Sequence, residues 1–330
     1  MMDFREELDR IRMENNRIAW LLSGYINVCP RAITAEMIAE SGCMDAPGQE
    51  LFYKMLMAQI CGLDYGTSDE EKSFYMRYWD KAIHRLDPDP YRQDPYYSNI
   101  HIPCIRKGKW ELAMEQYTPF EAFICRDITL TGNLEEIPHA GYFDIGFNFP
   151  AVRQNGREWM AVKPNEIETM RQPLDNISGN VATLGLGLGY FTYMASQKDS
   201  VERITVIERD RDAIGLFKEF ILPQFPHKDK VRIVEADAFS YAMDKMPEMD
   251  FDYVFADLWH DAGDGLEMYL KLKRIENLVP QSCFLYWIEE SLLSRLRWQM
   301  FDTSIASCHT KEEAMALLSD TALRAMAAIL

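Results

Sequence analysis

Three glycines at alternate positions could bring the polypeptide backbone against a bound ligand. Gly185, Gly187 and Gly189 follow the apolar run 181–184, and an apolar segment able to form a helix covers residues 190–197. Glycine is needed where the backbone turns with little steric room and passes close to a ligand, and the start of a helix directs N–H groups at that ligand. The spacing therefore predicts a strand, a tight turn and a helix start.

Acidic residues end the apolar runs that come after this turn. Glu208 ends the run 203–207 and lies 19 residues beyond Gly189. Acidic residues about 20 positions after such a turn commonly accept hydrogen bonds from the two ribose hydroxyls of a nucleoside cofactor. Asp237 and Asp257 follow the next two runs in a similar way. Together these residues predict a nucleoside site lined by acidic strand ends.

The elements that must position these residues alternate between strands and helices. Such alternation of apolar runs and helical segments demands a parallel sheet that is covered on both faces. Open sheets of this kind bind ligands at the carboxyl ends of their strands, which is where the polar residues collect in this chain. The sequence predicts an α/β fold with a Rossmann-like, doubly wound and mainly parallel sheet. The five predicted strands are residues 181–184, 203–207, 231–234, 251–256 and 283–288.

Residues 179 to about 290 resemble the class I, Rossmann-like S-adenosylmethionine-dependent methyltransferases and are similar to the spermidine-synthase-type aminopropyltransferases. The matching residues are Gly185-Leu-Gly187-Leu-Gly189, Glu208, Asp237-Ala238 and Asp257. The resemblance implies S-adenosyl-L-methionine as cofactor, with the glycine turn under its methionine part. It also implies that Glu208 holds the ribose, Asp237 accepts from the adenine amino group and Asp257 faces the transferred group. The implied cofactor-binding residues are Gly185, Gly187, Gly189, Tyr190, Glu208, Arg209, Asp237, Ala238 and Asp257.

Three positions decide among the possible cofactor classes. A dinucleotide-binding G-x-G-x-x-G turn needs glycine at position 190, where this chain has a bulky tyrosine, so a nicotinamide-dependent oxidoreductase is disfavoured. Methyltransferases often carry an acidic residue where Thr183 stands, and aminopropyltransferases usually carry an aspartate where Leu188 stands. The sequence favours methyl transfer to a small-molecule acceptor. The alternatives are aminopropyl transfer from the decarboxylated cofactor and cofactor binding without turnover.

Asp257 and His260 are the predicted catalytic residues. Transfer from a sulfonium is an in-line displacement, and an oxygen or amine acceptor benefits from a base that takes its proton. Asp257 stands where the superfamily places the residue nearest the transferred group, and histidine titrates near neutral pH. Asp261 and the pair Glu289–Glu290 could supply oxygen ligands to a divalent cation. Because acidic residues also suit the first turn of a helix, we expect the glutamate pair to begin a helix and predict no metal.

The first 178 residues predict a helical and β-hairpin module (1–178) ahead of the cofactor-binding domain (179–330). Apolar residues recur at helical spacing over residues 4–22, and helix-like stretches continue to residue 86. Segment 87–95 is rich in proline and aspartate and is not expected to form regular helix. Asn155-Gly156, between two strand-like runs, predicts a β-hairpin, and a helix is expected to start at Pro164. By family habit, this module would cover the substrate side of the sheet.

Composition limits the partners and the compartment. The chain has 52 acidic and 35 basic residues and a net charge of −17, whereas proteins that bind nucleic acid normally show a basic face. No segment approaches the roughly 20 apolar residues that span a bilayer. The seven cysteines include no C-x-x-C pair, and we expect buried thiols, among them Cys125 and Cys283, in a cytoplasmic protein. The expected helical tail 289–330 ends in an alanine- and leucine-rich segment that could form a homodimer contact.

Overall fold

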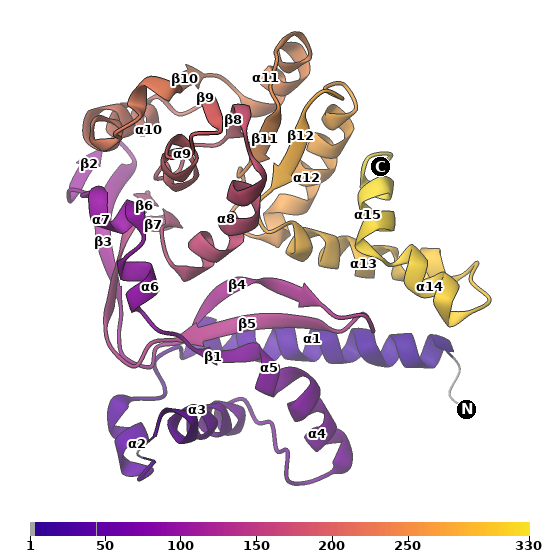
Figure 1. The fold of residues 1–330 in the computed structure, drawn as a ribbon. Coiled ribbons are helices and arrows are strands. Elements are labelled where there is room, and N and C mark those ends of the chain that lie inside the picture. Colours follow the sequence, from indigo (N-terminus) through magenta and orange to yellow (C-terminus); the bar gives the residue numbers. More distant parts are fainter. Residues whose placement is uncertain (1–3, 44) are drawn as a thin grey trace. The chain divides into compact units, whose positions relative to one another are not determined.

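The computed structural model describes residues 4–43 and 45–330, which divide into two compact units (Figure 1). Unit 1 contains Met1–Asp89, Gln116–Asn148 and Met300–Leu318, and unit 2 contains Pro90–Glu115, Phe149–Gln299 and Ser319–Leu330. Each unit is therefore assembled from segments that are far apart in the chain. Residues 90–115 and 149–178, which precede the glycine turn, group with that turn in unit 2.

Unit 1 is mainly helical. Its longest helix, α1 (Phe4–Val28), buries an apolar stripe at helical spacing, as the sequence predicts for residues 4–22. Thr34 starts α2 by accepting a hydrogen bond from the backbone N–H of Met37, which satisfies one of the N–H groups that a helix start leaves without a partner. The other helical segments of this unit are α2 (Ala35–Glu40), α3 (Ala46–Ile60), α4 (Asp69–Phe74), the π-helical η1 (Tyr75–Trp79), α5 (Asp80–Ala82) and α14 (Lys311–Leu317).

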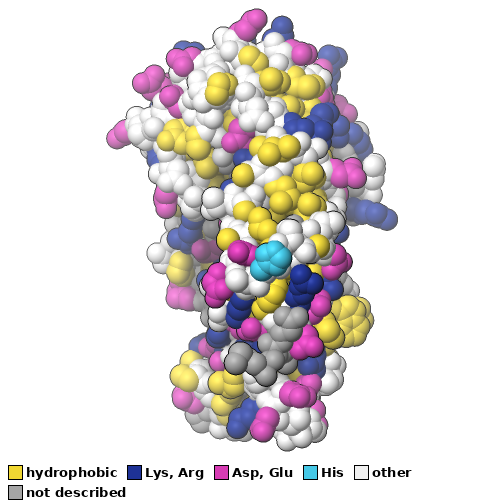
Figure 2. All heavy atoms as spheres, turned by 90° about the vertical axis from the view of Figure 1, so that its right-hand side faces the viewer, with side chains coloured by type: hydrophobic (Ala, Val, Ile, Leu, Met, Phe, Trp, Pro, Cys, Tyr) yellow, Lys and Arg dark blue, Asp and Glu magenta, His cyan; other side chains and the backbone are white. Residues whose placement is uncertain are grey.

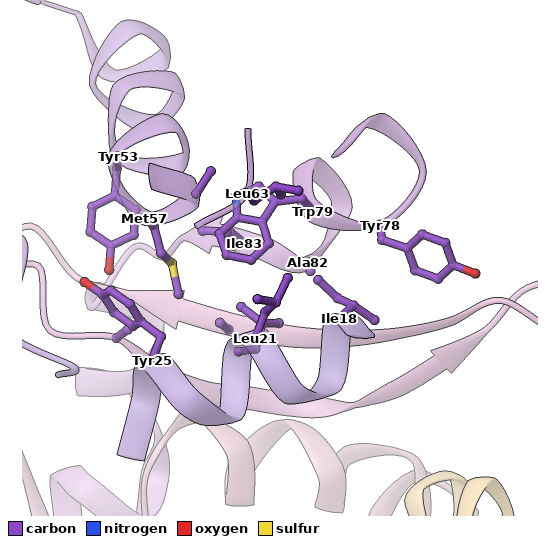
Figure 3. Close-up of a cluster of buried hydrophobic side chains, with 14 of the residues drawn as sticks. Ile18, Leu21, Tyr25, Tyr53, Met57, Leu63, Tyr78, Trp79, Ala82 and Ile83 are labelled. Carbon is purple, nitrogen blue, oxygen red and sulfur yellow. The ribbon is translucent and has the colours of Figure 1, made fainter. Parts of the chain in front are cut away.

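The core of unit 1 packs against a small sheet in the order β1–β5–β4, formed by Ile83–Arg85, Glu136–Tyr142 and Phe123–Leu130. Figure 3 shows Leu21 of α1 and Met57 of α3 in the same cluster as Trp79, whose side chain is fully buried. The ring of Tyr53 stacks on that of Tyr142 with 3.7 Å between centroids. Aromatic rings of this size dominate the apolar area that a core removes from water.

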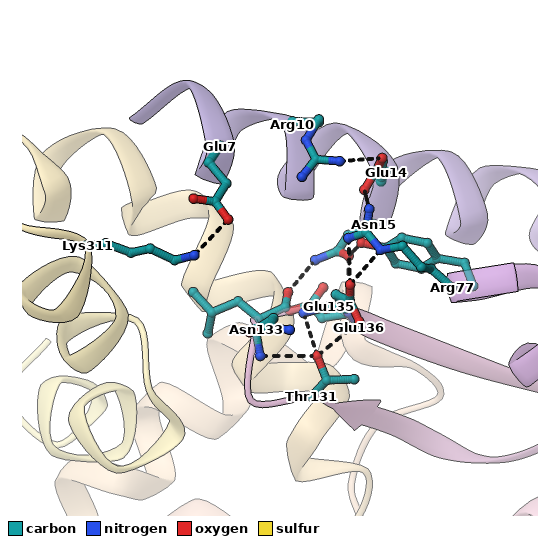
Figure 4. Close-up of polar contacts among 12 residues, drawn as sticks. Glu7, Arg10, Glu14, Asn15, Arg77, Thr131, Asn133, Glu135, Glu136 and Lys311 are labelled. Atoms are coloured by element: carbon teal, nitrogen blue, oxygen red, sulfur yellow. Dashed lines mark hydrogen bonds and ion pairs between the residues drawn. The ribbon is translucent and has the colours of Figure 1, made fainter. Parts of the chain in front are cut away.

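A buried asparagine fixes α1 against β5 and the segment before it (Figure 4). The Nδ2 of Asn15 donates to the carbonyl oxygen of Leu134, and its Oδ1 accepts from the N–H of Glu136 and from the hydroxyl of Tyr78. Because a buried amide without partners would be costly, these bonds favour one position of α1 along the sheet. Figure 4 also draws the ion pairs Arg77–Glu14, Arg77–Glu135, Arg10–Glu14 and Lys311–Glu7.

Unit 2 is built on a sheet of five parallel strands in the order β10–β9–β8–β11–β12. The chain forms β8, β9 and β10 outward in one direction and then crosses to the other side of β8 for β11 and β12. The order therefore reverses between β8 and β11, which creates a crevice at their carboxyl ends. The predicted α/β, Rossmann-like sheet is confirmed. Its strands are β8 (Gly179–Leu184), β9 (Val201–Glu208), β10 (Val231–Glu235), β11 (Tyr253–Ala256) and β12 (Cys283–Tyr286).

Helices cover both faces of this sheet (Figure 1). The connections α9 (Tyr190–Ser196) and α10 (Arg211–Leu216) lie on one face, and α11 (Ala238–Asp244) and α12 (Ala262–Glu276) lie on the other. Right-handed crossovers require this arrangement when the strand order reverses. Because both faces are covered, central residues such as Val181, Ile204 and Val254 are fully buried. Short helical turns complete the connections: η2 (Phe217–Ile221), η3 (Leu222–Gln224), η4 (Lys228–Lys230) and η5 (Met246–Glu248).

A second sheet, in the order β2–β3–β6–β7, contains the predicted hairpin. Asn155 and Gly156 join β6 to β7 with positive φ angles of 52° and 81°, which the favoured two-residue turn between antiparallel strands requires. Helix α8 (Pro164–Asn176) then starts at the predicted proline, whose fixed φ suits the first helical position. The strands are β2 (Ile105–Lys107), β3 (Trp110–Tyr117), β6 (Phe147–Gln154) and β7 (Arg157–Ala161).

Three expectations drawn from the sequence are wrong. Residues 83–86 do not continue the preceding helix, because Ile83–Arg85 pairs with β5 as strand β1. The segment 87–95 contains one helical turn, α6 (Asp89–Arg92), since Pro90 stands in its first turn, where no N–H partner is lost. Cys283 is exposed, although Cys125 is buried as expected. The C-terminal tail is helical as predicted, in α13 (Glu289–Ile305), α14 and α15 (Asp320–Ala327), and a short α7 (Pro95–Asn99) precedes β2.

The surface drawn in Figure 2 mixes acidic and basic side chains, so neither sign of charge covers that face alone. No disulfide bond joins any of the seven cysteines, all of which lie within the described residues. Across residues 4–43 and 45–330, every helix is too short or too polar to cross a membrane.

Two histidines on neighbouring strands of unit 1 belong to one hydrogen-bond network. His84 Nε2 lies 2.9 Å from Nδ1 of His139 and 3.1 Å from a guanidinium nitrogen of Arg126. The hydroxyl of Thr129 lies 2.8 Å from the other ring nitrogen of His139. Burial, with the charge of Arg126 as a smaller cause, lowers the pKa of His84 to about 4 and that of His139 to about 3. Both imidazoles are therefore neutral at neutral pH.

This network predicts that the protein loses stability in mild acid. The unfolded imidazoles bind protons below about pH 6.5, while the folded ones resist until about pH 4, so the free energy of unfolding should fall as the pH drops from 6.5 towards 4. Denaturant unfolding of the double variant His84→Gln/His139→Gln should show a weaker pH dependence than that of the wild type. The control is His227→Gln, because His227 is exposed. If the free energy of unfolding depended on pH equally in the wild type, the double variant and this control, His84 and His139 would not cause the effect.

Candidate functional site

The glycine turn lies at the carboxyl end of β8, and its three glycines have φ angles that other residues rarely adopt. These angles are 101° at Gly185, 51° at Gly187 and 73° at Gly189. Space is also lacking, because a Cβ atom on Gly185 would collide with the carbonyl oxygen of Asp257 and one on Gly189 would collide with the ring of Phe217. Neighbouring atoms therefore leave no room for a side chain at Gly185 or Gly189, so the turn keeps its shape only with glycine at these positions.

One hollow, here called the glycine hollow, joins the turn to the end of β9. Its cavity volume is about 20 Å³, which is room for about one water molecule. Gly187 and Glu208 both line it, as the sequence predicts for two residues that contact one cofactor. The remaining lining is largely aromatic and aliphatic: Trp110, Leu112, Val152, Trp159, Ala213, Leu216, Phe217 and Ile221. A ligand larger than water could enter only if lining side chains moved, and it would then meet aromatic faces and the Glu208 carboxylate.

The thioether of Met160 occupies the position directly above the glycine turn. Its sulfur accepts a hydrogen bond from the backbone N–H of Leu188 at 3.1 Å. A Cβ atom built on Gly187 would lie 2.5 Å from the same sulfur. Met160 belongs to β7, so the second sheet places a flexible, polarisable side chain where a ligand would meet the turn.

Glu208 is held by the backbone that follows it. Its Oε1 accepts the N–H of Asp210 at 2.8 Å, and Asp210 in turn pairs with Lys109 of the β2–β3 connection at 2.6 Å. Burial raises the pKa of Glu208, although the N–H groups of Asp210 and Arg209 lower it. A carboxylate in this position has a fixed orientation and can accept hydrogen bonds from a diol.

The other predicted cofactor residues lie further from the hollow. Tyr190 is buried at the start of α9, and its hydroxyl donates to Asp94 Oδ2 at 2.9 Å. Asp237 is exposed and caps α11 by accepting from the N–H and the hydroxyl of Ser240, which lowers its pKa. Ala238 follows it as the first residue of that helix, and Arg209 is exposed after β9. These four residues are not among those that line the glycine hollow.

Asp257 meets a second carboxyl group, that of Glu166 from α8. The backbone N–H of Asp257 donates to Leu184 at the end of β8, which brings Asp257 beside the glycine turn. Glu166 is only 5% exposed, and its Oε2 has no hydrogen-bond partner among the described residues. The nearest cation in sequence, Lys163, pairs with Glu158 at 2.6 Å. Two carboxyl groups therefore approach each other without a basic side chain bonded to either.

The electrostatics of this pair favour one retained proton. Burial raises the pKa of Asp257 from 3.8 to about 7. Burial also raises the pKa of Glu166 well above its ordinary value, and the negative charge of Asp257 raises it further. Two like charges in a poorly hydrated site cannot both ionise at ordinary pH. The pair therefore retains a proton to a higher pH than two separate carboxyl groups would.

His260 lies on the surface beside this region. Its side chain is 42% exposed, its Nδ1 lies 3.3 Å from Asp264 Oδ2, and its ring packs edge-on against Trp159 with 4.1 Å between centroids. Asp264 and Asp261 form the capping box that starts α12. The contact between His260 and Trp159 connects this histidine to the lining of the glycine hollow.

The carboxylates considered for a metal have other partners. Glu289 accepts from the hydroxyl of Tyr269 at 2.8 Å and pairs with Arg324, and Glu290 pairs with the same guanidinium. Both glutamates stand in the first turn of α13, as expected from the sequence. In the described part of the chain, no three histidine, cysteine, aspartate or glutamate residues come together in a way that could hold a metal ion.

Sequence reasoning missed Glu166 and Met160. A glutamate three residues into a helix that begins with Lys163-Pro164 looks like an ordinary partner of the helix dipole. A methionine in a strand looks like a packing residue. The sequence signal that could have identified them is their position, because the hairpin and its helix directly precede β8 and so must pass near the glycine turn.

No protein-family model and no curated protein matches the chain. Among solved structures, it is similar to a spermidine synthase in complex with the transition-state analogue AdoDATO, at 17% identity and a TM-score of 0.29. It is also similar to the spermidine synthase from Thermotoga maritima, at 16% identity and a TM-score of 0.27. Both matches cover 38% of this chain and 50% and 48% of the solved chains, so the chain spans about half their length. At these values, the assignment of the fold rests on the strand order and not on the matches.

Proposed function

We propose that this protein is a transferase that moves a methyl group from S-adenosylmethionine to a small-molecule acceptor. The observation that carries the proposal is that Gly187 and Glu208, two residues predicted from sequence to contact one cofactor, line the same hollow. Glu208 would accept hydrogen bonds from the ribose hydroxyls. Trp110 and Trp159 would pack against the adenine ring, since planar bases stack well on aromatic side chains.

The acceptor would bind beside Asp257 and Glu166. These two carboxyl groups, with the unpartnered Oε2 of Glu166, form a place rich in hydrogen-bond acceptors and poor in donors. An acceptor molecule with N–H or O–H groups would supply the missing donors. The ionised Asp257 would then take the proton that such a nucleophile loses as its new bond to carbon forms.

Aminopropyl transfer is the second candidate, and the same carboxyl pair favours it. Decarboxylated S-adenosylmethionine carries an ammonium group without a neighbouring carboxylate, and an acidic site suits that charge. Leu188 counts against it, because the leucine side chain is fully buried where an aspartate would hold the amine. Methyl transfer therefore remains the first proposal.

Calorimetric titration of the purified protein separates these functions. The ligands are S-adenosylmethionine, its decarboxylated form, S-adenosylhomocysteine, methylthioadenosine and NAD. Tight binding of S-adenosylhomocysteine would support methyl transfer, and preference for the decarboxylated form or methylthioadenosine would support aminopropyl transfer. Binding of NAD alone would refute both, and binding without turnover on any amine or hydroxyl acceptor would favour a cofactor sensor.

Replacement of Glu208 should weaken all adenosyl ligands alike. Each hydrogen bond to a charged carboxylate contributes roughly 1.5–3 kcal/mol, so Glu208→Ala should reduce affinity about ten-fold or more. Methylthioadenosine and S-adenosylhomocysteine should suffer equally in titrations, because both contain the ribose. The control is Glu235→Ala, since Glu235 lies opposite Glu208 in the sheet register but pairs with the exposed Arg211. A loss confined to one ligand would show that Glu208 contacts something other than the sugar.

Removal of the Met160 thioether should strengthen binding. In the structure, the sulfur of Met160 accepts a hydrogen bond from the N–H of Leu188 and fills the space beside Gly187. A ligand at the glycine turn must therefore displace the Met160 side chain. A hydrogen bond contributes about 0.5–1.5 kcal/mol, and Met160→Ala should therefore bind S-adenosylhomocysteine roughly three- to ten-fold more tightly. Met160→Leu keeps the bulk without the acceptor and should gain less. Weaker binding by the alanine variant would mean that Met160 contacts the ligand directly.

The carboxyl pair predicts the pH dependence of turnover. Because burial raises the pKa of Asp257 to about 7, the rate should rise as the pH increases through 7 and Asp257 loses its proton. Asp257→Asn should retain cofactor affinity and lose most turnover. Glu166→Gln imitates the protonated acid, so its turnover rate should still rise with pH near 7. This variant is the matched control. A wild-type rate that stays constant between pH 6 and 8 would exclude Asp257 as the base.

A further inference from the structure

A second hollow in unit 2, here called the arginine hollow, lies at the amino ends of the parallel strands. Its cavity volume is about 250 Å³, and it is open to solvent. Arg203 and Arg232 line it together with Asn180, Thr205 and Tyr241. The glycine turn and Glu208 stand at the opposite, carboxyl ends of β8 and β9. The two hollows therefore share strands but no lining residue.

The strand register places the polar residues of this hollow on one face of the sheet. Asn180 of β8 lies opposite Arg203 of β9, and Thr205 of β9 lies opposite Arg232 of β10. Arg203 and Thr205 are two residues apart and so point to the same side. With neighbouring strands about 4.8 Å apart and a rise of about 3.3 Å per residue, the two arginine Cα atoms stand roughly 8 Å apart.

This polar group interrupts a face that is otherwise apolar. Further along the same strands, the residues on this face are Ala182, Leu184, Ile207 and Val234. A sheet face covered by a helix normally carries only apolar side chains. Tyr241 of α11 lines the hollow, so the helix that covers this face reaches the polar group. Thr205 is buried in this group, whereas Arg203 and Arg232 are exposed to solvent where their strands begin.

Neither guanidinium has a partner in the described part of the chain. Arg203 and Arg232 form no ion pair there, although Asp250 also lines the hollow. Thr205 is almost fully buried, and no described residue bonds to its hydroxyl. Burial raises the pKa of the Tyr241 phenol and the charge of Arg232 lowers it, so the guanidinium and the phenol are close. Two positive charges and two hydroxyl groups thus line one space, with the carboxylate of Asp250 lining it beside them.

We propose that the arginine hollow binds a small oxyanion, a phosphate ester or a carboxylate, between Arg203 and Arg232. The planar guanidinium group donates parallel hydrogen bonds that match the oxygen atoms of both classes of anion. The hydroxyls of Thr205 and Tyr241 supply further donors. A protein with a net charge of −17 repels anions in general, so an anion that binds here is held by this local geometry. The proposal is independent of the function assigned to the glycine hollow.

Calorimetric titration of the full chain at constant ionic strength tests the proposal. The two probes are inorganic phosphate and succinate. Saturable binding of phosphate would indicate a phosphate ester as the natural ligand, and saturable binding of succinate would indicate a dicarboxylate. Arg203→Gln and Arg232→Gln should each weaken the bound probe about ten-fold or more. Arg157→Gln is the matched control, because this exposed arginine at the β6–β7 turn removes the same charge elsewhere.

Three outcomes would overturn the proposal: no saturable binding of either probe, an equal loss in Arg157→Gln, or unchanged affinity in both hollow variants. Because a general change in folding could imitate a loss of binding, each variant is also compared with the wild type in thermal unfolding. Glu208→Ala should bind the anion as the wild type does. This result separates the arginine hollow from the glycine hollow even if no adenosyl ligand binds the protein.

Discussion

The close contact between the ends of β8 and β11 is the constraint on which the candidate site depends. The N–H of Asp257 donates to Leu184, and the N–H of Gly185 donates to Ile207 on the other side. A side chain at position 185 would displace the carbonyl of Asp257, because no space separates the two backbones there. Because Gly185 has no side chain, the ends of β8, β9 and β11 can approach closely enough to form these hydrogen bonds. This contact holds Asp257 beside the turn, and the end of β9 places Glu208 at the edge of the glycine hollow.

Burial gives the acidic residues around that contact different properties. Asp237 caps a helix in water and has a lowered pKa, whereas Asp257 and Glu166 share a poorly hydrated place and have raised ones. The same functional group thus becomes a permanent charge in one position and a proton acceptor in another. The partner carboxyl comes from α8, which precedes the parallel sheet in the chain. The helix that precedes the sheet thus contributes a second carboxyl group to the candidate site.

Local sequence signals predicted the elements whose formation depends on neighbours in the chain. Apolar β-branched runs predicted the strands of the parallel sheet, and Asn155-Gly156 predicted the hairpin of the second sheet, because two-face burial and turn geometry restrict residue types strongly. Strand β1 was missed because its pairing with β5 joins residues 57 positions apart, such as Ile83 and Ala140, and a three-residue strand has no pattern of its own. Glu166 was missed for a related reason: its acidity depends on Asp257, and only the folded chain brings them together. The roles of the site residues remain predictions.

The two hollows lie at opposite ends of β9, and the length of this strand determines how far they influence each other. Arg203 and Glu208 stand on the same strand, and five residues of extended chain span about 16 Å. Charges exposed to solvent are screened over about 8 Å at physiological ionic strength, so an anion near Arg203 would change the potential at Glu208 only slightly. Direct electrostatic coupling between the hollows is therefore weak. Any coupling between ligands at the two ends would have to pass through movement of β9 itself, and its buried central residues, packed between covering helices, oppose such movement.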